Sequence, residues 1–392
     1  MRSTVIVDAV RTPIGLRNGG LSGWHPADLV GELLRSLDGR DALAGGPPGD
    51  VVLGCVMAAG AQTANIARSA VLAAGWPAGT PALTVDRQEA SGLAAFEVAV
   101  ATVATGRCEV ALAGGVELMS LVPAAATVGT GEFGHPYGPR AIARYEASGG
   151  LIPIAVAADR EAVALGLDRR ELDEWACASH ERAGAAHRDG RFAAELVHMA
   201  DRRRSGGVGA GDVEADEGPR APDRAAFAAF PPTFEAAGLV TAANSAPVGD
   251  GAAAVVVSAE DGARAAGQRA LARVVGFGVG AGDPGDAFGP SGRAVADVLA
   301  RCGRTLDDID RFEFHEARAA DVVAWLRSSG ARGDRVNPCG GAIALGDPLG
   351  MSGARLVTTL AHALARGECR QGLVCVPASG GQAMAVVLER CD

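Results

Sequence analysis

The chain has 392 residues with 36 basic and 46 acidic side chains, so its formal net charge is −10. Every basic side chain is an arginine, and the absence of lysine excludes Schiff-base chemistry, lysine-anchored pyridoxal phosphate and the P-loop lysine of nucleotide hydrolases. Net acidity disfavours nucleic-acid binding, and no charge-free apolar run reaches the roughly 18 residues of a membrane span, so we expect a cytoplasmic protein without nucleic-acid or membrane partners.

Strand-like and helix-like runs alternate in two series along the chain. The first series predicts strands over 4–10, 51–56, 82–85 and 110–114, and helices over 26–37 and 92–105. The second predicts strands over 252–258, 272–278, 311–314, 372–376 and 383–388, and helices over 293–302 and 353–365. This alternation is typical of an α/β fold with a largely parallel sheet that is covered on both faces.

The two series share a spaced set of residues. Ser91, Gly92, Ala104, Gly106 and Cys108 recur 261 positions later as Ser352, Gly353, Ala365, Gly367 and Cys369. Chance in a chain rich in Ala and Gly is one explanation, and duplication into two pseudo-twofold domains is the other. We expect an N-terminal domain made of residues 1–116 and 251–271, and a C-terminal domain made of residues 272–392. Residues 117–250 should form a loop insertion in the N-terminal domain, with a helix over 169–191.

The cysteines predict no metal site. None of the eight belongs to a C-x-x-C pair, and none is spaced as a zinc ligand with His315 or His362. We expect reduced and mostly buried thiols.

Several segments in chain order resemble thiolases, and together they cover nearly the whole chain. They are VIVDAVRTPIG at 5–15, AGGVELMS at 113–120, TAAN at 241–244, DGAA at 250–253, GGAIALG at 340–346, PLG at 348–350 and GGQ at 380–382. The resemblance implies the thiolase fold: two pseudo-twofold α-β-α domains in a five-layer α-β-α-β-α core, with a loop insertion. It also implies a homodimer or a larger oligomer.

The positions that carry thiolase catalysis differ in this chain. Glu89, in DRQEASG, replaces the nucleophilic Cys, and Asp347 replaces the His of the G-H-P motif. Pro377 replaces the second Cys, and His315, in HEAR, replaces the Asn of N-E-A-F. Covalent thiolysis is therefore the reaction least compatible with these residues.

The replacements admit functional and structural interpretations. Glu89 is either a cap on a helix N-terminus or a general base. His315 is either a proton-transferring group oriented by Asp347 or Glu316, or a remnant of a decayed pocket. Backbone N–H groups at Glu89 and around Ser379 and Gly380 could stabilise an oxyanion or enolate.

Two cysteines are candidates to replace the missing nucleophile. A slip of one or two residues could bring Cys375 near the site, but one thiol would still lack its His and its partner. Cys339 fits better as a small core residue.

Substrate binding is implied only by the resemblance. Arg220 resembles the thiolase Arg near the adenine of coenzyme A, whereas Ala246 stands where a Ser contacts pantetheine. We expect no tightly bound cofactor and an acyl thioester substrate, carried by coenzyme A or by a carrier protein.

Three functions stay open. The first is an enzyme that acts on an acyl thioester, or on a β-keto or carboxylated compound, by non-covalent acid/base chemistry such as condensation, decarboxylation or hydrolysis. The second is a catalytically silent partner subunit of an intact thiolase or ketosynthase. The third is acetyl-CoA acetyltransferase, as overall similarity suggests.

Overall fold

The computed structural model describes residues 1–128, 134–204 and 211–391. Its main sheet has two halves. The first half contains, in spatial order, β1 (Thr4–Arg11), β8 (Gly249–Ala259), β5 (Val110–Leu118), β3 (Val51–Gly54) and β4 (Ala82–Val85), with β2 (Gly15–Leu16) also paired to β8. The second half contains β9 (Ala272–Ala281), β12 (Gln382–Glu389), β11 (Gln371–Ala378) and β10 (Arg311–Phe314). A short β1–β9 pairing, Val5 with Arg273 and Ile6 with Ala272, joins the halves.

The prediction of a largely parallel sheet is wrong. Only β3–β4, β3–β5 and β10–β11 pair in parallel in the described sheet, whereas β1–β8, β5–β8, β11–β12 and β9–β12 are antiparallel. The reason lies in the connections, because parallel neighbours need a long crossover whereas a tight turn forces antiparallel pairing. The β11–β12 turn is such a case, with Gly380 and Gly381 at φ +81° and +69°.

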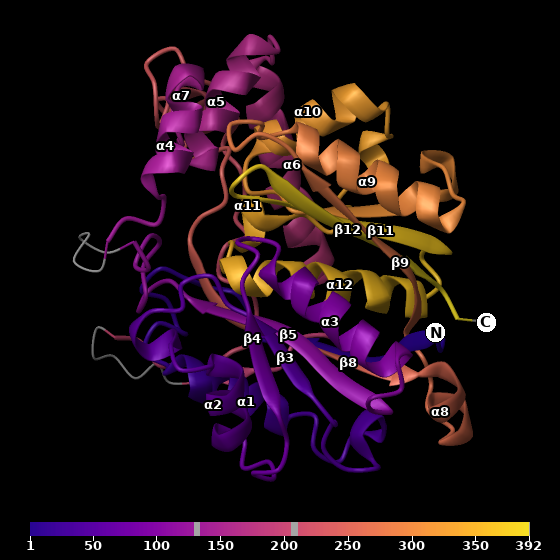
Figure 1. Cartoon of the computed structure of the whole chain (residues 1–392). Helices are drawn as coiled ribbons and strands as arrows, with labels where there is room; N and C mark the ends of the chain where they lie inside the picture. Colours follow the sequence, from indigo (N-terminus) through magenta and orange to yellow (C-terminus); the bar gives the residue numbers. More distant parts are fainter. Residues whose placement is uncertain (129–133, 205–210, 392) are drawn as a thin grey trace.

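The layers follow from which helices share a core with each sheet face (Figure 1). On the outside of the first half lie α1 (Pro26–Arg35) and α2 (Ile66–Ala73). Between the halves lie α3 (Ser91–Ala104) and α12 (Leu349–Ala365), which share one core with strands of both. On the outside of the second half lie α9 (Gly289–Cys302) and α10 (Ala319–Ser329). The expected five-layer α-β-α-β-α core is confirmed.

The two central helices cross at glycines 261 positions apart. A Cβ on Gly92 would lie 2.7 Å from the Gly350 carbonyl oxygen and 2.8 Å from the Ala354 nitrogen. A Cβ on Gly353 would lie 2.4 Å from the Leu93 nitrogen. Each glycine therefore lets the backbone of the other helix approach, which favours the duplication over chance.

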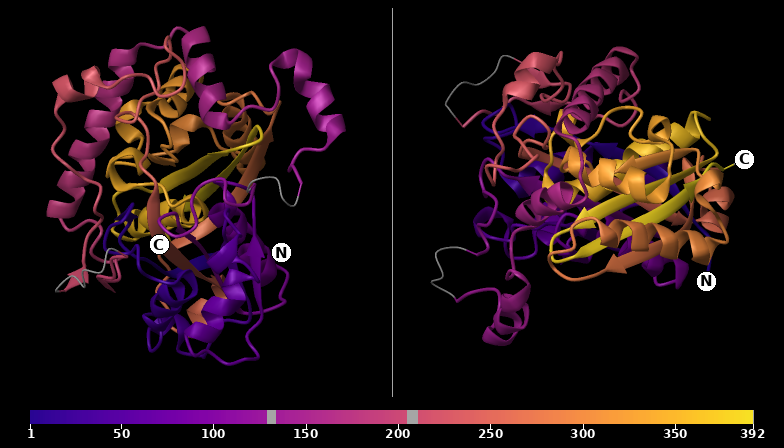
Figure 2. Two further views of the ribbon diagram at one scale, coloured as in Figure 1. Left: turned by 90° about the vertical axis from the view of Figure 1, so that its left-hand side faces the viewer. Right: turned by 90° about the horizontal axis from the view of Figure 1, so that it is seen from above.

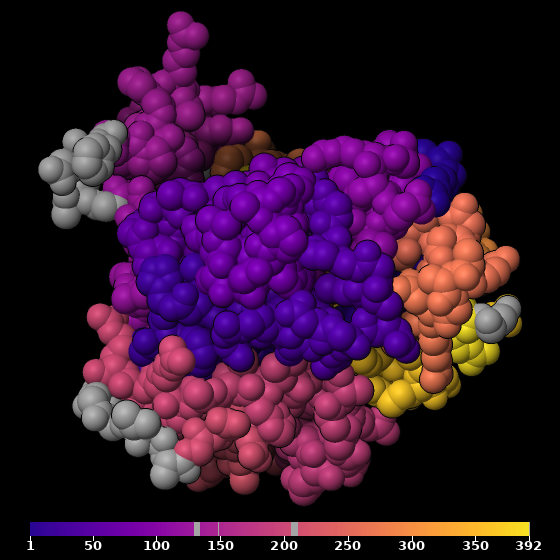
Figure 3. Space-filling view, turned by 90° about the horizontal axis from the view of Figure 1, so that it is seen from below, coloured from indigo at the N-terminus to yellow at the C-terminus, as the bar shows by residue number. Residues whose placement is uncertain are grey.

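The insertion packs mainly beside the second half of the sheet (Figure 2). Its elements are α4 (Pro139–Tyr145), α5 (Ile154–Ala164), α6 (Arg169–Arg188), β6 (Met199–Ala200), β7 (Asp212–Val213) and α7 (Arg224–Ala229). Helix α4 buries none of its residues and belongs to a magenta segment that stands out from the body in Figure 3. Two short helices lie outside the insertion: α8 (Glu260–Ala265) follows β8, and α11 (Ala342–Leu345) precedes α12. No helix in the described ranges is long and apolar enough to cross a membrane.

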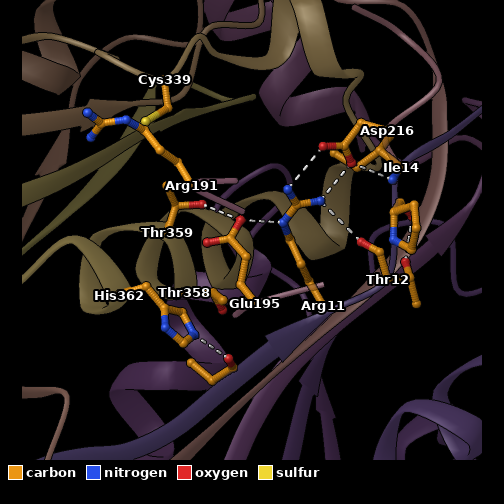
Figure 4. A network of polar contacts seen from close by, with 12 residues as sticks. Arg11, Thr12, Ile14, Arg191, Glu195, Asp216, Cys339, Thr358, Thr359 and His362 are labelled. Carbon is orange, nitrogen blue, oxygen red and sulfur yellow. Dashed lines mark hydrogen bonds and ion pairs between the residues drawn. The ribbon is translucent and has the colours of Figure 1, made fainter. Parts of the chain in front are cut away.

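A buried ion network ties the insertion to β1 (Figure 4). The Arg11 guanidinium donates from Nε to Glu195 at 2.6 Å and from Nη1 to Asp216 at 2.7 Å. Burial opposes ionisation of Asp216, but Arg11 and His187 hold its pKa well below the usual range. Thr359 of α12 also donates to Glu195, so the network links the insertion, β1 and the central layer.

Candidate active site

Four chain segments bring the candidate residues to one end of the central layer. Glu89 lies just before α3, and His315 follows β10 directly. Asp347 precedes α12, and Ser379 follows β11. Gln88, next to Glu89, has φ +51°, a conformation that is costly for a residue with a side chain and that clusters at functional sites.

His315 and Asp347 form a buried pair. The imidazole Nε2 lies 2.9 Å from Asp347 Oδ1, which also accepts a 2.6 Å hydrogen bond from the Ser352 hydroxyl. Burial alone would lower the pKa of His315, but the charge and hydrogen bond of Asp347, with a further contribution from Glu89, raise it above its ordinary value. Burial opposes ionisation of Asp347 as well, and His315 overcomes this to lower its pKa. The pair therefore favours an imidazolium beside a carboxylate.

The other imidazole nitrogen has no partner. His315 is fully buried, and its Nδ1 is one of the buried polar atoms in the described residues without a hydrogen bond. Since Asp347 holds Nε2, this nitrogen is left to interact with something bound in the site.

Glu89 contacts the turn after β11. Its carboxylate accepts a 2.7 Å hydrogen bond from the backbone N–H of Ser379 and a 2.8 Å hydrogen bond from the Ser379 hydroxyl. The sequence suggests this N–H as a donor for an oxyanion, but in the structure it is already engaged. The backbone of Gly380 shapes the tight turn, with φ +81°.

Glu316 does not orient His315. Its buried carboxylate accepts hydrogen bonds from Trp175 Nε1 at 2.5 Å and from the Ser179 hydroxyl at 2.6 Å, both on α6. Burial raises its pKa. Although next to His315 in sequence, Glu316 faces the insertion, so the suggestion that it orients His315 is wrong, whereas a catalytic role for Glu316 stays a prediction.

The two candidate cysteines, Cys375 and Cys339, are buried thiols. Cys375 packs in the outer core with Phe314 and Trp325, away from the central helices, and burial raises its pKa to about 12. Cys339 accepts a 3.4 Å hydrogen bond from Arg311, and burial raises its pKa too. Both are protonated at neutral pH and poor nucleophiles.

Arg220 and Ala246, which the resemblance connects with substrate binding, have different neighbours in the structure. The Arg220 guanidinium stacks 5.7 Å from the ring centroid of Phe227, and His180 meets the same ring edge-on at 5.9 Å. The backbone N–H of Ala246 donates to the Ala317 carbonyl, which places Ala246 beside the loop that follows His315. Within the described ranges, no group of three His, Cys, Asp or Glu side chains could hold a metal ion.

Sequence reasoning missed the hydroxyls of Ser352 and Ser379. The repeat contained a signal for the first, because Ser91 and Ser352 are 261 positions apart and both turn back onto the loop before their helix. Ser91 Oγ accepts from the Arg87 N–H at 2.8 Å and donates to the Gln88 carbonyl at 2.5 Å, as Ser352 donates to Asp347.

Comparison with known proteins gives full-length matches. Residues 4–261 match the family model described as "Thiolase, N-terminal domain", and residues 268–390 match "Thiolase, C-terminal domain". The β-ketoadipyl-CoA thiolase of Pseudomonas aeruginosa is 38% identical, with 99% of each chain covered. The steroid 3-ketoacyl-CoA thiolase of Mycobacterium tuberculosis is 36% identical over all of this chain and 95% of its own length.

Three further matches are an acetyl-CoA acetyltransferase and two solved structures. The acetyl-CoA acetyltransferase of Pseudomonas aeruginosa is 36% identical with both chains fully covered. The crystal structure of the Bacillus anthracis acetyl-CoA acetyltransferase superposes with a TM-score of 0.88 at 31% identity, over 100% of this chain and 99% of its own. The human mitochondrial 3-ketoacyl-CoA thiolase gives 0.87 at 30% identity, with the same coverage.

Proposed function

Because the chain belongs to the thiolase family, we propose that it acts on an acyl thioester carried by coenzyme A or by a carrier protein. The names of the relatives support the coenzyme A form, since they are thiolases and an acetyltransferase of acyl-CoA compounds. We also retain the expected homodimer or larger oligomer as a proposal, which light scattering of the purified protein tests.

We propose that the chemistry is proton transfer without an acyl-cysteine. Glu89 and His315 would exchange protons with the substrate, and Asp347 would hold the imidazole in place. The observation that carries this proposal is a half-buried carboxylate, held by Ser379, whose charge acts on a buried His–Asp pair. Such a constellation contains a base and an acid in one site.

The names of the relatives favour the alternative, acyl transfer as in acetyl-CoA acetyltransferase, over chemistry without cysteine. The residues favour the opposite conclusion. A carboxylate is a poor acyl acceptor compared with a thiolate, because the anhydride it would form is higher in energy than the thioester. The buried Cys375 and Cys339 thiols are protonated as well.

A thiolysis assay separates the two proposals. Purified protein with acetoacetyl-CoA and coenzyme A should give no acetyl-CoA above background. An acetyl-CoA yield at the roughly 1–10³ s⁻¹ typical of enzymes would establish acyl transfer and contradict our proposal.

A further inference from the structure

We propose that the site hydrolyses neutral acyl thioesters: Glu89 activates a water molecule, and His315 Nδ1 binds the thioester carbonyl oxygen. This inference rests on the acyl-thioester function proposed above. It selects hydrolysis from the three reactions considered above, which also include condensation and decarboxylation. It also assigns Ser379 the role of positioning the Glu89 carboxylate.

The carbonyl-binding donor follows from the hydrogen bonds at the site. The backbone N–H of Ser379 already donates to Glu89 at 2.7 Å, so it is engaged. His315 Nδ1 is fully buried and has no partner, whereas Nε2 is fixed 2.9 Å from Asp347. Asp347 favours the protonated form of the imidazole. In that form Nδ1–H is a buried donor on a positively charged ring, and such a donor stabilises a developing oxyanion.

The base follows from the contacts of Glu89. An ionised carboxylate offers about four acceptor positions, and Ser379 uses two of them, one on each oxygen. Glu89 is half-buried rather than sealed, so water can reach the remaining positions. The two hydrogen bonds from Ser379 restrict the carboxylate to one orientation, and general-base catalysis depends on such orientation.

The charges disfavour decarboxylation. No ion pair joins Glu89 to Arg87 or to another cation of the described residues, so its negative charge is uncompensated by direct contact. Asp347 is a second carboxylate, and it pairs with His315 at 2.9 Å. A malonyl-type substrate would bring a third carboxylate into this site, where the charges of Glu89 and Asp347 would repel it.

The site also disfavours condensation. Condensation through an acyl-enzyme needs a nucleophile to hold the first acyl group, and Glu89 stands where the family has its cysteine. Direct condensation without an acyl-enzyme would need two acyl thioesters in the site together, whereas hydrolysis needs one thioester and a water molecule. Hydrolysis therefore makes the smaller demand on the groups present.

The proposed step balances. Water oxygen bonds to the thioester carbonyl carbon while Glu89 takes a water proton, and the carbonyl oxygen becomes an oxyanion held by His315 Nδ1–H. The tetrahedral intermediate then collapses, the C–S bond breaks, and the leaving thiolate takes the proton from Glu89. The products are the carboxylic acid and the free thiol, and both protein groups return to their starting state.

The test measures thiol release from neutral thioesters (acetyl-, butanoyl-, octanoyl- and benzoyl-CoA) and from anionic ones (malonyl- and succinyl-CoA). We expect release from at least one neutral thioester and a rate reduced on the order of 10²–10⁴-fold in Glu89→Gln. Glu97→Gln, the same change at a glutamate within α3, is the matched control and should leave the rate unchanged. Ser379→Ala should lower kcat roughly 10- to 100-fold with little change in KM, and Ser379→Thr, which keeps a hydroxyl, should restore much of it.

Single-turnover reaction in ¹⁸O-water should place the label in the product acid. Label in the Glu89 carboxylate would show a nucleophilic rather than a general-base role and overturn this inference. Faster CO₂ release from malonyl-CoA than thiol release from any neutral thioester, dependent on Glu89, would overturn hydrolysis while leaving proton chemistry intact. No Glu89-dependent thiol release from any neutral thioester would also overturn it, and an acyl-cysteine would overturn the proposed function itself.

Discussion

Replacing Gly353 with Ala tests the close crossing of the two central helices. The added Cβ would lie 2.4 Å from the Leu93 nitrogen and 2.9 Å from the Leu93 Cβ, whereas ordinary contacts begin near 3.4 Å. The helices must therefore separate by about 1.0 Å, since 3.4 − 2.4 = 1.0. Overpacking of this kind costs about 1–3 kcal/mol of folding free energy, and more where only backbone atoms can move.

Gly292→Ala is the matched control. Gly292 is also a helical glycine, but beyond its own stretch of helix no atom of the described residues lies within 4 Å of the position that its Cβ would take. Alanine should therefore add about 0.5–1 kcal/mol of stability through helix propensity. Urea unfolding followed by circular dichroism should place the midpoint of Gly353→Ala below, and that of Gly292→Ala above, that of the parent chain. Equal midpoints for the two variants would refute the close crossing.

Three further outcomes follow from the buried charges. Asp347→Asn should lower kcat/KM roughly 10- to 150-fold, the equivalent of about 1.5–3 kcal/mol for a hydrogen bond to a charged group, as steady-state kinetics would show. Asp347, Glu89 and Asp321 raise the pKa of His315 against the effect of burial, so activity should fall as the pH rises through this raised pKa. In Asp347→Asn, a pH–rate profile should show the same fall in activity at lower pH. Arg11→Met should lower the free energy of unfolding by about 3–5 kcal/mol, measured by urea titration, because the buried Glu195 would lose its cation and the buried Asp216 would keep only His187. An unchanged midpoint would contradict this.

The sequence predicted the elements better than their pairing. The strands over 82–85 and 311–314 have the expected bounds, and the helix predicted over 92–105 is Ser91–Ala104. A run of apolar residues predicts a buried strand. It does not predict the direction of that strand, because parallel and antiparallel strands that are covered on both faces are equally buried. Strand direction depends on connections, so β8, which returns after the long insertion, could not be placed from its own composition. The domain boundaries stay predictions.

The candidate site was predictable as a set of positions but not as a set of contacts. Family motifs located Glu89, His315, Asp347 and Ser379, and the fold brings their segments together. Sequence adjacency misassigned Glu316, because the side chains of successive residues after a strand point in opposite directions. The Glu89–Ser379 contact joins residues 290 positions apart and depends on side-chain rotamers, which no local pattern specifies.

The central claim is that acyl-thioester chemistry proceeds here without an acyl-cysteine. The most direct test is the mass of the intact protein, quenched with acid during turnover of a neutral acyl-CoA, followed by peptide mapping. We predict that the protein keeps its unmodified mass while free thiol accumulates. An acyl group on any cysteine, formed and discharged at the rate of turnover, would contradict the account.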